Sequence, residues 1–135
     1  LIMATPMLQV DIVTPEASAF SGEASEVILP AWEGQLGVYP GHDSLLSLIR
    51  AGRCVVTTSK GVHRYVVGRG FAEIGPGHVT ILTDRFEELE AVDKAKAQKE
   101  LEEAENELLE CDASSERWNQ AQIALEHARA RLASD

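Results

Sequence analysis

Residues 20–42, FSGEASEVILPAWEGQLGVYPGH, decide the fold because short β-branched runs alternate there with turn-forming residues. The run EVILP is expected to form a strand that follows a turn at Ser21-Gly22 and is closed by Pro30 and Gly34. The run QLGVY is expected to form the next strand and to end at Pro40-Gly41. Proline at a strand end costs no ladder hydrogen bond. The segment therefore predicts strands joined by tight turns.

The same pattern extends on both sides of this segment, from the N-terminus to about Arg85. Turn residues separate further short apolar runs, and none of these runs has the length or period of a helix. Such spacing is typical of an antiparallel β-sandwich or barrel. We predict a β-sandwich of about ten short strands over residues 1–86. The runs are LQVDIVT, SLLSLI, CVVTT, HRYVV, FAEI and VTILT.

Residues 87–135 have a different character, because neither proline nor glycine occurs there and Ala, Glu, Lys and Leu dominate. A first helix is predicted from an N-cap at Asp93 to about Glu110, and a second from Ser114 or Ser115. The short CDASS break makes the helices antiparallel neighbours, so residues 87–135 are expected to form a helical hairpin. The apolar stripes are Ala97, Leu101, Ala104 and Leu108 on the first helix and Trp118, Ala121, Leu125, Ala128 and Leu132 on the second.

Large side chains are few in this hairpin. Leu101, Leu108, Trp118, Leu125 and Leu132 have to offset the ordering of about forty residues. The hairpin alone is therefore expected to be marginally stable, so that it either docks on the sandwich or changes partner.

Charge and composition exclude several classes of function. The formal net charge is −10, which argues against nucleic acid as a partner, because phosphate binding requires clustered Lys and Arg. Residues 1–85 carry six basic and eight acidic residues, net −2, whereas residues 86–135 carry six and fourteen, net −8. No run approaches the ~20 apolar residues of a membrane span, and the start lacks a signal-peptide pattern. We expect a soluble chain without transmembrane insertion.

The candidate reactive residues do not form an enzyme signature. His42, Asp43 and Ser44 are the residue types of a hydrolase triad, but sequence neighbours point in different directions and do not build the required chain of contacts. The glycines of GQLGVYPG lack the spacing of nucleotide-binding loops. The four histidines and two cysteines show no metal-ligand spacing, and Cys54 and Cys111 form no paired-cysteine motif. The sequence predicts a non-catalytic chain without metal.

One cluster of charged residues remains. Asp93 and Lys96 lie at the start of the first predicted helix, and His127 and Arg131 near the end of the second. An antiparallel hairpin brings them to the same end. There they can pair with one another, complement a helix C-terminus or hold a phosphate.

The whole chain resembles the epsilon subunit of bacterial F-type ATP synthases. The matching residues are Phe20-Ser21-Gly22, Glu33-Gly34, Leu36 to His42, Leu45-Leu46, Gly70-Phe71 with Glu73, and Val79 to Asp84. Two positions depart from the family pattern: Ser44 stands where proline is common, and Arg69 where glycine is common.

The resemblance implies a non-catalytic subunit of the rotating central stalk, between the gamma subunit and the c-ring. It implies a peripheral location at the cytoplasmic face of the bacterial inner membrane. The loop EGQLGVYPGH corresponds to the family's ring end, so Glu33, Gln35, Tyr39 and His42 are the candidate contacts with the ring or gamma.

The resemblance also implies that the hairpin can leave the sandwich, reach the alpha and beta subunits along gamma, and inhibit ATP hydrolysis. Some members bind ATP at the hairpin, which makes Asp93, Lys96, His127 and Arg131 the candidate nucleotide-binding residues. Lys96 and His127 stand where those members have arginine, which removes the rigid fork that holds phosphate. We expect no bound cofactor and at most weak ATP binding.

A rival hypothesis from the residues alone is a free-standing adaptor. In it the sandwich binds a peptide or ligand, and the acidic hairpin forms homo-oligomers through a coiled coil. The stalk hypothesis predicts co-purification with gamma, whereas the adaptor hypothesis predicts a homo-oligomer without gamma.

Overall fold

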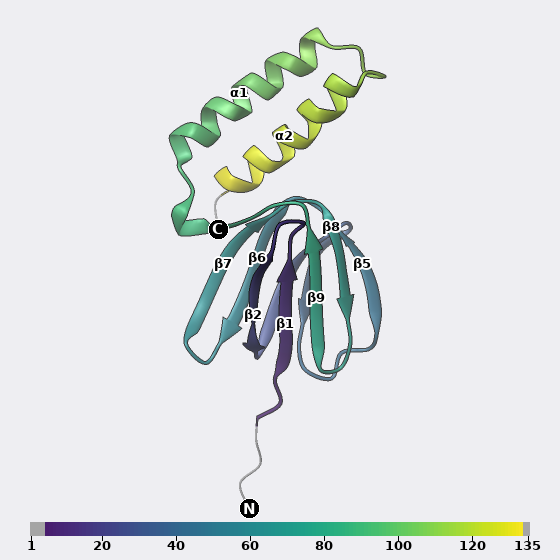
Figure 1. The fold of residues 1–135 in the computed structure, drawn as a ribbon, viewed down its shortest axis with the longest axis vertical. Helices are drawn as coiled ribbons and strands as arrows, with labels where there is room; N and C mark the ends of the chain where they lie inside the picture. The colour runs from purple at the N-terminus through teal and green to yellow at the C-terminus, as the bar shows by residue number, and fades with distance from the viewer. Residues whose placement is uncertain (1–4, 134–135) are drawn as a thin grey trace, which may run out of the picture.

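A computed structural model describes residues 5–133, so the outer ends of both predicted segments lie outside the described residues. Ten strands are followed by one 3-10 turn and two helices (Figure 1). The strands are β1 Leu8–Val13, β2 Ser18–Ala24, β3 Glu26–Ala31, β4 Gly34–Val38, β5 Leu45–Ile49, β6 Gly52–Thr58, β7 Gly61–Val67, β8 Gly70–Ile74, β9 His78–Thr83 and β10 Phe86–Glu88. The 3-10 turn is η1 Leu89–Ala91, and the helices are α1 Lys94–Glu110 and α2 Glu116–Leu132.

The strands form one continuous path that folds over on itself. Their order is β10-β7-β6-β3-β5-β8-β9-β1-β2, with β4 on the other edge of β3. Strands β3 and β5 meet at a single residue pair, Ala31 with Ile49, and the sheet turns its corner there. The predicted β-sandwich followed by a helical hairpin is confirmed.

The core lies between the two halves of the folded sheet. Alternate residues of β1, namely Leu8, Val10 and Ile12, are fully buried, as the period of two requires. Next to the hairpin end the Tyr65 ring packs between Phe20 and Phe86, with centroid distances of 5.9 and 4.7 Å. The predicted strand faces therefore build one continuous apolar core.

One pairing departs from the antiparallel pattern. Strand β1 runs parallel to β9, with Val10 opposite Val79 and Ile12 opposite Ile81. Parallel neighbours need a long crossover connection, and here everything from β2 to β8 supplies it. Strand β1 is antiparallel to β2 on its other side.

The turn predicted at Ser21-Gly22 was wrong, because these residues lie inside β2. Ser21 faces Asp11 across the β1–β2 pair, and its hydroxyl donates a hydrogen bond of 2.7 Å to the Asp11 carboxylate. The chain bends instead at Ser25. A Cβ at Gly22 would lie 3.4 Å from the Phe20 ring, an ordinary van der Waals contact, so neither a turn nor close packing requires glycine there.

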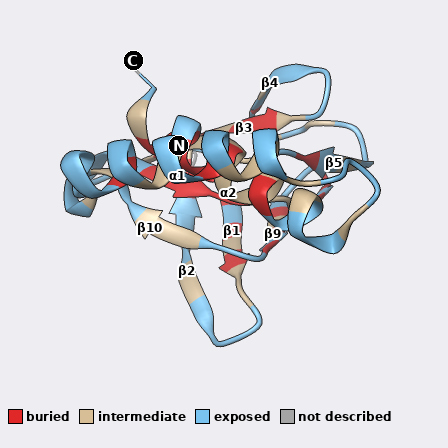
Figure 2. Cartoon of the chain, turned by 90° about the horizontal axis from the view of Figure 1, so that it is seen from above, coloured by how far each residue is buried: buried red, intermediate tan, exposed pale blue. Residues whose placement is uncertain are grey.

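The predicted helical hairpin forms with the caps that the sequence indicated. The Asp93 side chain accepts a hydrogen bond from the Lys96 amide, and Ser115, the second of the two candidate caps, accepts one from the Trp118 amide. The hairpin sits on one end of the sandwich, with α2 nearer to the strands and α1 outside it (Figure 1). Seen from above, the outer side of α1 is largely exposed (Figure 2).

Strand β10 extends the sandwich beyond residue 86. Phe86, Glu87 and Glu88 pair with Val67, Val66 and Tyr65 of β7. The division into residues 1–86 and 87–135 stays a prediction, and in the structure the expected boundary falls within β10.

Candidate interaction surfaces

An apolar stripe crosses the outer face of β5, β8 and β9. Leu48 pairs with Phe71 and Phe71 with Leu82, so the three side chains stand in one row on one face. They are 53%, 49% and 49% exposed. Their neighbours in sequence, Ile49 and Ala72, point into the core. A row of large apolar side chains that no part of the described chain covers is typical of a protein-binding surface.

The stripe adjoins an open hollow of about 600 Å³ between β4 and β5. Trp32, Leu36 and the exposed Leu45 and Leu46 are among its lining residues, and Glu33 is its charged member. The hollow forms because β4 pairs with β3 and leaves its other edge open. Apolar stripe and hollow together make one side of the sandwich suited to bind a partner.

The four predicted contact residues do not form one loop surface. Glu33 lies in the β3–β4 turn and Gln35 pairs with Pro30, near the point where β3 meets β5. Tyr39 and His42 follow the opposite end of β4, about 13 Å along the strand. A surface that includes all four residues therefore runs along β4.

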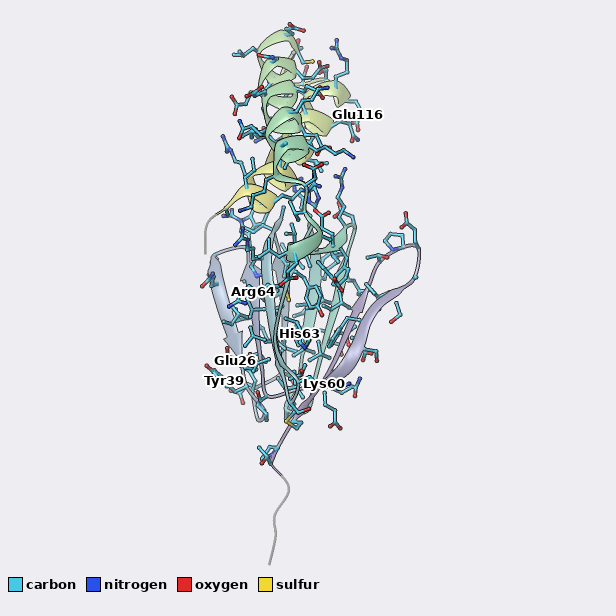
Figure 3. The ribbon with its side chains drawn as sticks, turned by 90° about the vertical axis from the view of Figure 1, so that its left-hand side faces the viewer. Glu26, Tyr39, Lys60, His63, Arg64 and Glu116 are labelled. Atoms are coloured by element: carbon cyan, nitrogen blue, oxygen red, sulfur yellow. The ribbon has the colours of Figure 1, made fainter. Side chains whose placement is uncertain are left out.

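Tyr39 lies at the end of the sandwich opposite the hairpin (Figure 3), and the His42 amide donates a hydrogen bond of 3.2 Å to the Tyr39 carbonyl oxygen. The adjacent Glu26 carboxylate raises the pKa of Tyr39, first through a side-chain hydrogen bond and then through its charge. His42 Nδ1 lies 2.6 Å from the backbone oxygen of Asp43, a local loop contact. No contact joins His42 to Ser44 among the described hydrogen bonds, so the triad residue types do not assemble there.

The hairpin is held on the sandwich by charged contacts. Arg69, between β7 and β8, makes a bidentate contact with Glu126 of α2, with N–O distances of 2.8 and 2.5 Å. The hydrogen bond to Glu126 raises the pKa of Arg69. Burial lowers this pKa, but its effect is smaller than that of the hydrogen bond. Arg53 of β6 donates to the carbonyl oxygen of Ala133 just after α2. Cations from the sandwich thus meet acceptors on the hairpin.

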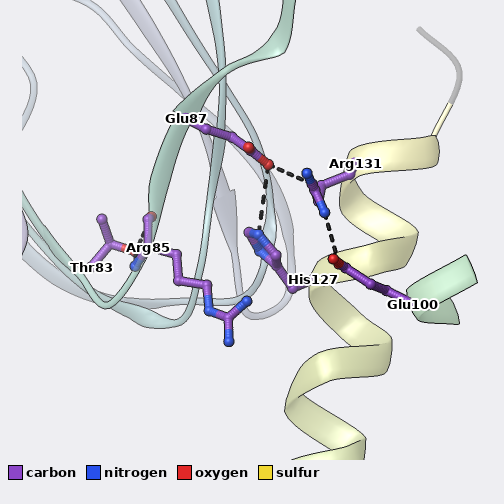
Figure 4. A network of polar contacts seen from close by, with 6 residues as sticks. All are labelled: Thr83, Arg85, Glu87, Glu100, His127 and Arg131. Atoms are coloured by element: carbon purple, nitrogen blue, oxygen red, sulfur yellow. Dashed lines mark hydrogen bonds and ion pairs between the residues drawn. The ribbon is translucent and has the colours of Figure 1, made fainter. Parts of the chain in front are cut away.

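In a second cluster the sandwich supplies a carboxylate and α2 supplies the basic side chains. We call Glu87, His127, Arg131 and Glu100 the Glu87 cluster (Figure 4). Glu87 Oε1 of β10 lies 2.6 Å from Arg131 Nε and 3.7 Å from His127 Nε2 of α2. Arg131 also donates a hydrogen bond of 2.8 Å to Glu100 of α1. His127 and Arg131 are only 6% and 9% exposed. Arg131 therefore ties both helices to the last strand of the sandwich.

Burial lowers the pKa of His127, and the nearby Arg85 guanidinium lowers it further. The Glu87 carboxylate opposes these effects, and Arg131 and Asp84 make smaller contributions of opposite sign. The neutral imidazole is therefore the form that suits the docked hairpin.

The structure brings together two of the four candidate nucleotide-binding residues. His127 and Arg131 share the Glu87 cluster, where two carboxylates already neutralise Arg131. Asp93 and Lys96 are exposed, and Asp93 uses a carboxylate oxygen to cap α1. Of the three uses that the sequence left open, ion pairing explains Arg131 in this conformation, and His127 lies buried beside it as a neutral imidazole.

Sequence reasoning missed the partners of these groups. Arg69 was visible as a departure from the family pattern, but Glu126 lies 57 positions further on. Glu87 and Glu100 gave no local signal, because many acidic residues of the C-terminal segment have the same sequence surroundings. Only the tertiary structure selects them.

Three further features of the described part of the chain concern metal binding, membrane-spanning helices and the two cysteines. Within residues 5–133 no group of three or more His, Cys, Asp or Glu side chains is arranged to hold a metal ion. None of the helices there is long and apolar enough to cross a membrane. Cys54 is buried in the core, where burial raises its pKa to about 12, and Cys111 follows α1 at the hairpin tip.

Fold and surfaces together define a β-sandwich subunit that carries a docked helical hairpin and offers an apolar side to a partner. The family model for the ATP synthase delta/epsilon chain β-sandwich domain matches residues 7–89. The chain belongs to this family. The predicted resemblance is confirmed, and the chain is a non-catalytic subunit of the ATP synthase complex.

Relatives match nearly the full length. ATP synthase epsilon chain 2 of Ralstonia nicotianae is 40% identical over 131 residues, which are 96% of this chain and 93% of the relative. The ATP synthase epsilon chain of Synechococcus sp. (strain WH7803) is 37% identical over 127 residues, 93% of each chain.

Two solved structures of mitochondrial ATP synthases contain a chain with a similar fold. A chain of the Euglena gracilis mitochondrial ATP synthase, in a structure of OSCP, F1 and c-ring, superposes with a TM-score of 0.81 at 26% identity and covers 93% of this chain and 79% of its own. A chain from the central stalk and c-ring of the Tetrahymena thermophila mitochondrial ATP synthase gives a TM-score of 0.62 at 12% identity, with 92% of each chain covered, and supports the fold alone.

Proposed function

We propose that this subunit belongs to the rotor of a proton-translocating ATP synthase and couples the c-ring to the gamma subunit. It acts as a peripheral protein at the cytoplasmic face of the bacterial inner membrane. Its hairpin regulates ATP hydrolysis. The observation that carries the proposal is the apolar stripe Leu48–Phe71–Leu82, which is the kind of surface that a permanent subunit contact needs.

The stripe suits the gamma subunit because it lies on the sheet, where backbone pairing holds the side chains in fixed positions. Transmission of torque requires an interface that does not yield, and apolar side chains on a sheet above a packed core supply one. Tyr39 and His42 precede β5, and the exposed Leu46 and Leu48 on one face of that strand lead from their end of the sandwich to the rest of the stripe. We assign them to the gamma side.

The polar β3–β4 turn suits the ring. Glu33 and Gln35 present a carboxylate and an amide at the other end of β4, and Gly34 there has a φ of 137°, which a side chain rarely adopts. The turn is therefore tight and projects polar groups. Such groups match the polar loops between membrane helices better than an apolar surface does.

The hairpin suits a regulatory role because its docking depends on charged contacts and small side chains. The Glu87 cluster and the Arg69–Glu126 pair join it to the sandwich, while the large apolar core lies elsewhere. Such a contact can open without unfolding the sandwich. In the open state the hairpin can reach the alpha and beta subunits and inhibit hydrolysis.

Substitution in the stripe tests the proposal. In a complex reconstituted from purified subunits, Phe71→Glu should abolish co-purification with gamma and uncouple proton pumping from ATP hydrolysis. The matched control is Val62→Glu on β7, which is 48% exposed and stands outside the stripe. It should retain both activities. Gamma binding by Phe71→Glu at the wild-type level, with both variants folded, would refute the assignment, and a homo-oligomer without gamma would favour the adaptor hypothesis.

A further inference from the structure

The buried imidazole of His127 has a geometry that accepts one proton but not two. Its Nε2 faces Glu87 Oε1 at 3.7 Å, longer than a hydrogen bond, so this carboxylate is the acceptor toward which the single N–H of the neutral ring can point. Its Nδ1 is buried and has no hydrogen-bond partner among the described residues. A second N–H would therefore point to a site without an acceptor, which is a costly arrangement.

Charged groups from every neighbouring element surround this ring. Arg85 and Asp84 precede β10, and Glu87 lies on it. Glu16, from the β1–β2 loop, lines the same hollow as His127 and these three residues. Arg131 lies one turn further along α2 and links to Glu100 of α1. Two guanidiniums and four carboxylates therefore surround the ring, and none of these carboxylates accepts a hydrogen bond from its Nδ1.

We propose that His127 is a proton-operated latch, which holds the hairpin on the sandwich while neutral and releases it on protonation. This inference rests on the proposed ability of the hairpin to leave the sandwich. It adds the signal that drives this motion, namely acidification of the surrounding solution, and the residue that senses it.

The direction of the effect follows from linkage. In the released hairpin His127 is exposed, and its pKa returns to about 6.5. In the docked hairpin burial and Arg85 lower the pKa below that value. The released form therefore binds the extra proton more tightly. Docking has its full strength above about pH 6.5 and weakens as the pH falls below it.

The hairpin position can be measured in the full chain with two spin labels. Cys111 marks the hairpin tip, and Ser59→Cys adds a label in the exposed β6–β7 turn at the other end of the sandwich (Figure 3). Cys54 should stay unlabelled, because it is fully buried and its pKa is raised to about 12. Pulsed electron paramagnetic resonance then reports docked and released populations.

Between about pH 7.5 and about pH 5.5 the released fraction should rise several-fold, with a midpoint in the range of histidine. His127→Gln, which stays neutral, should make the population independent of pH. The matched control His78→Gln, at the start of β9 beside Glu73, should retain the wild-type response. A pH-independent population in the wild type, or an unchanged response in His127→Gln, would overturn the latch.

A second measurement covers the case in which His127→Gln fails to dock. In the unaltered chain, the imidazole NMR signal of His127 should titrate together with the released fraction. Titration at the ordinary value while the hairpin stays docked would also overturn the latch. Neither result affects the gamma co-purification test, and a failure of gamma binding would leave this titration unchanged, so the two proposals fail separately.

Discussion

The sandwich and the hairpin are stabilised by different kinds of contact. In the sandwich the fully buried side chains are large and branched, such as Leu29, Ile74 and Ile81. In the hairpin Leu125 is the large apolar side chain among the buried residues, which are otherwise alanines and the charged or polar Arg131 and His127. A core of the first kind is permanent, whereas contacts of the second kind are weaker and depend on solution conditions.

The largest expected effect comes from the core. Ile81→Ala should lower the free energy of unfolding of the sandwich by about 3 kcal/mol, because it removes fully buried methyl groups and leaves a cavity. Urea denaturation followed by circular dichroism measures it. The control is Leu109→Ala on α1, where the side chain is 86% exposed and the change should stay below about 0.5 kcal/mol. Equal effects would contradict the contrast between the two regions.

A smaller effect is expected at the Glu87 cluster. Arg131→Met should weaken hairpin docking by about 2 kcal/mol, because Glu87 and Glu100 lose their shared cation. Hydrogen exchange should accelerate in α2 and remain unchanged in the sheet. The exposed Arg129 provides the control, and Arg129→Met should leave exchange as in the wild type. Acceleration throughout the sheet would show that the cluster belongs to the core.

The cap of the second helix contributes less again. Ser115→Ala removes the hydroxyl that accepts a hydrogen bond from the Trp118 amide, and it should destabilise α2 by about 1 kcal/mol. Faster exchange confined to the first turn of α2 is the expected result. Ser114→Ala is the control, because Ser114 bonds to Asp112 instead. Equal effects of the two substitutions would reject Ser115 as the cap.

Removal of the hairpin should change the sandwich least of all. A chain that ends at Glu88 retains β10 and its pairing with β7. It should unfold cooperatively and still bind gamma, with a denaturation midpoint close to that of the sheet in the full chain. Loss of cooperative unfolding would show that the hairpin is part of the core and would contradict the predicted two-part division.

The sequence predicted most of the fold because its signals are local. Proline and glycine at strand ends, the period of two in β1, and the caps at Asp93 and Ser115 all lie within a few residues of the element that they define. Strand β2 was missed because SAFSGEA lacks β-branched residues and contains a Ser-Gly pair that favours turns. Its pairing with β1 overrides that local preference.

The surfaces were harder to predict because register and tertiary contacts create them. Leu48, Phe71 and Leu82 are unremarkable in sequence and form a row only when β5, β8 and β9 pair as observed. The resemblance indicated the β3–β5 region, but only the structure separates Glu33 and Gln35 from Tyr39 and His42. The candidate role of His127 in phosphate binding stays a prediction, and its burial beside Glu87 could not be foreseen from the sequence.

The parallel pairing of β1 with β9 has a consequence for synthesis of the chain on the ribosome. Val10 emerges first, but its partner Val79 follows 69 positions later (79 minus 10), which at roughly 5–20 residues per second is a delay of seconds. Throughout this delay β1 has only β2 to pair with. Closure of the sandwich has to wait for β9, so the nascent chain exposes one edge of its first strand until residues 78–83 have been made.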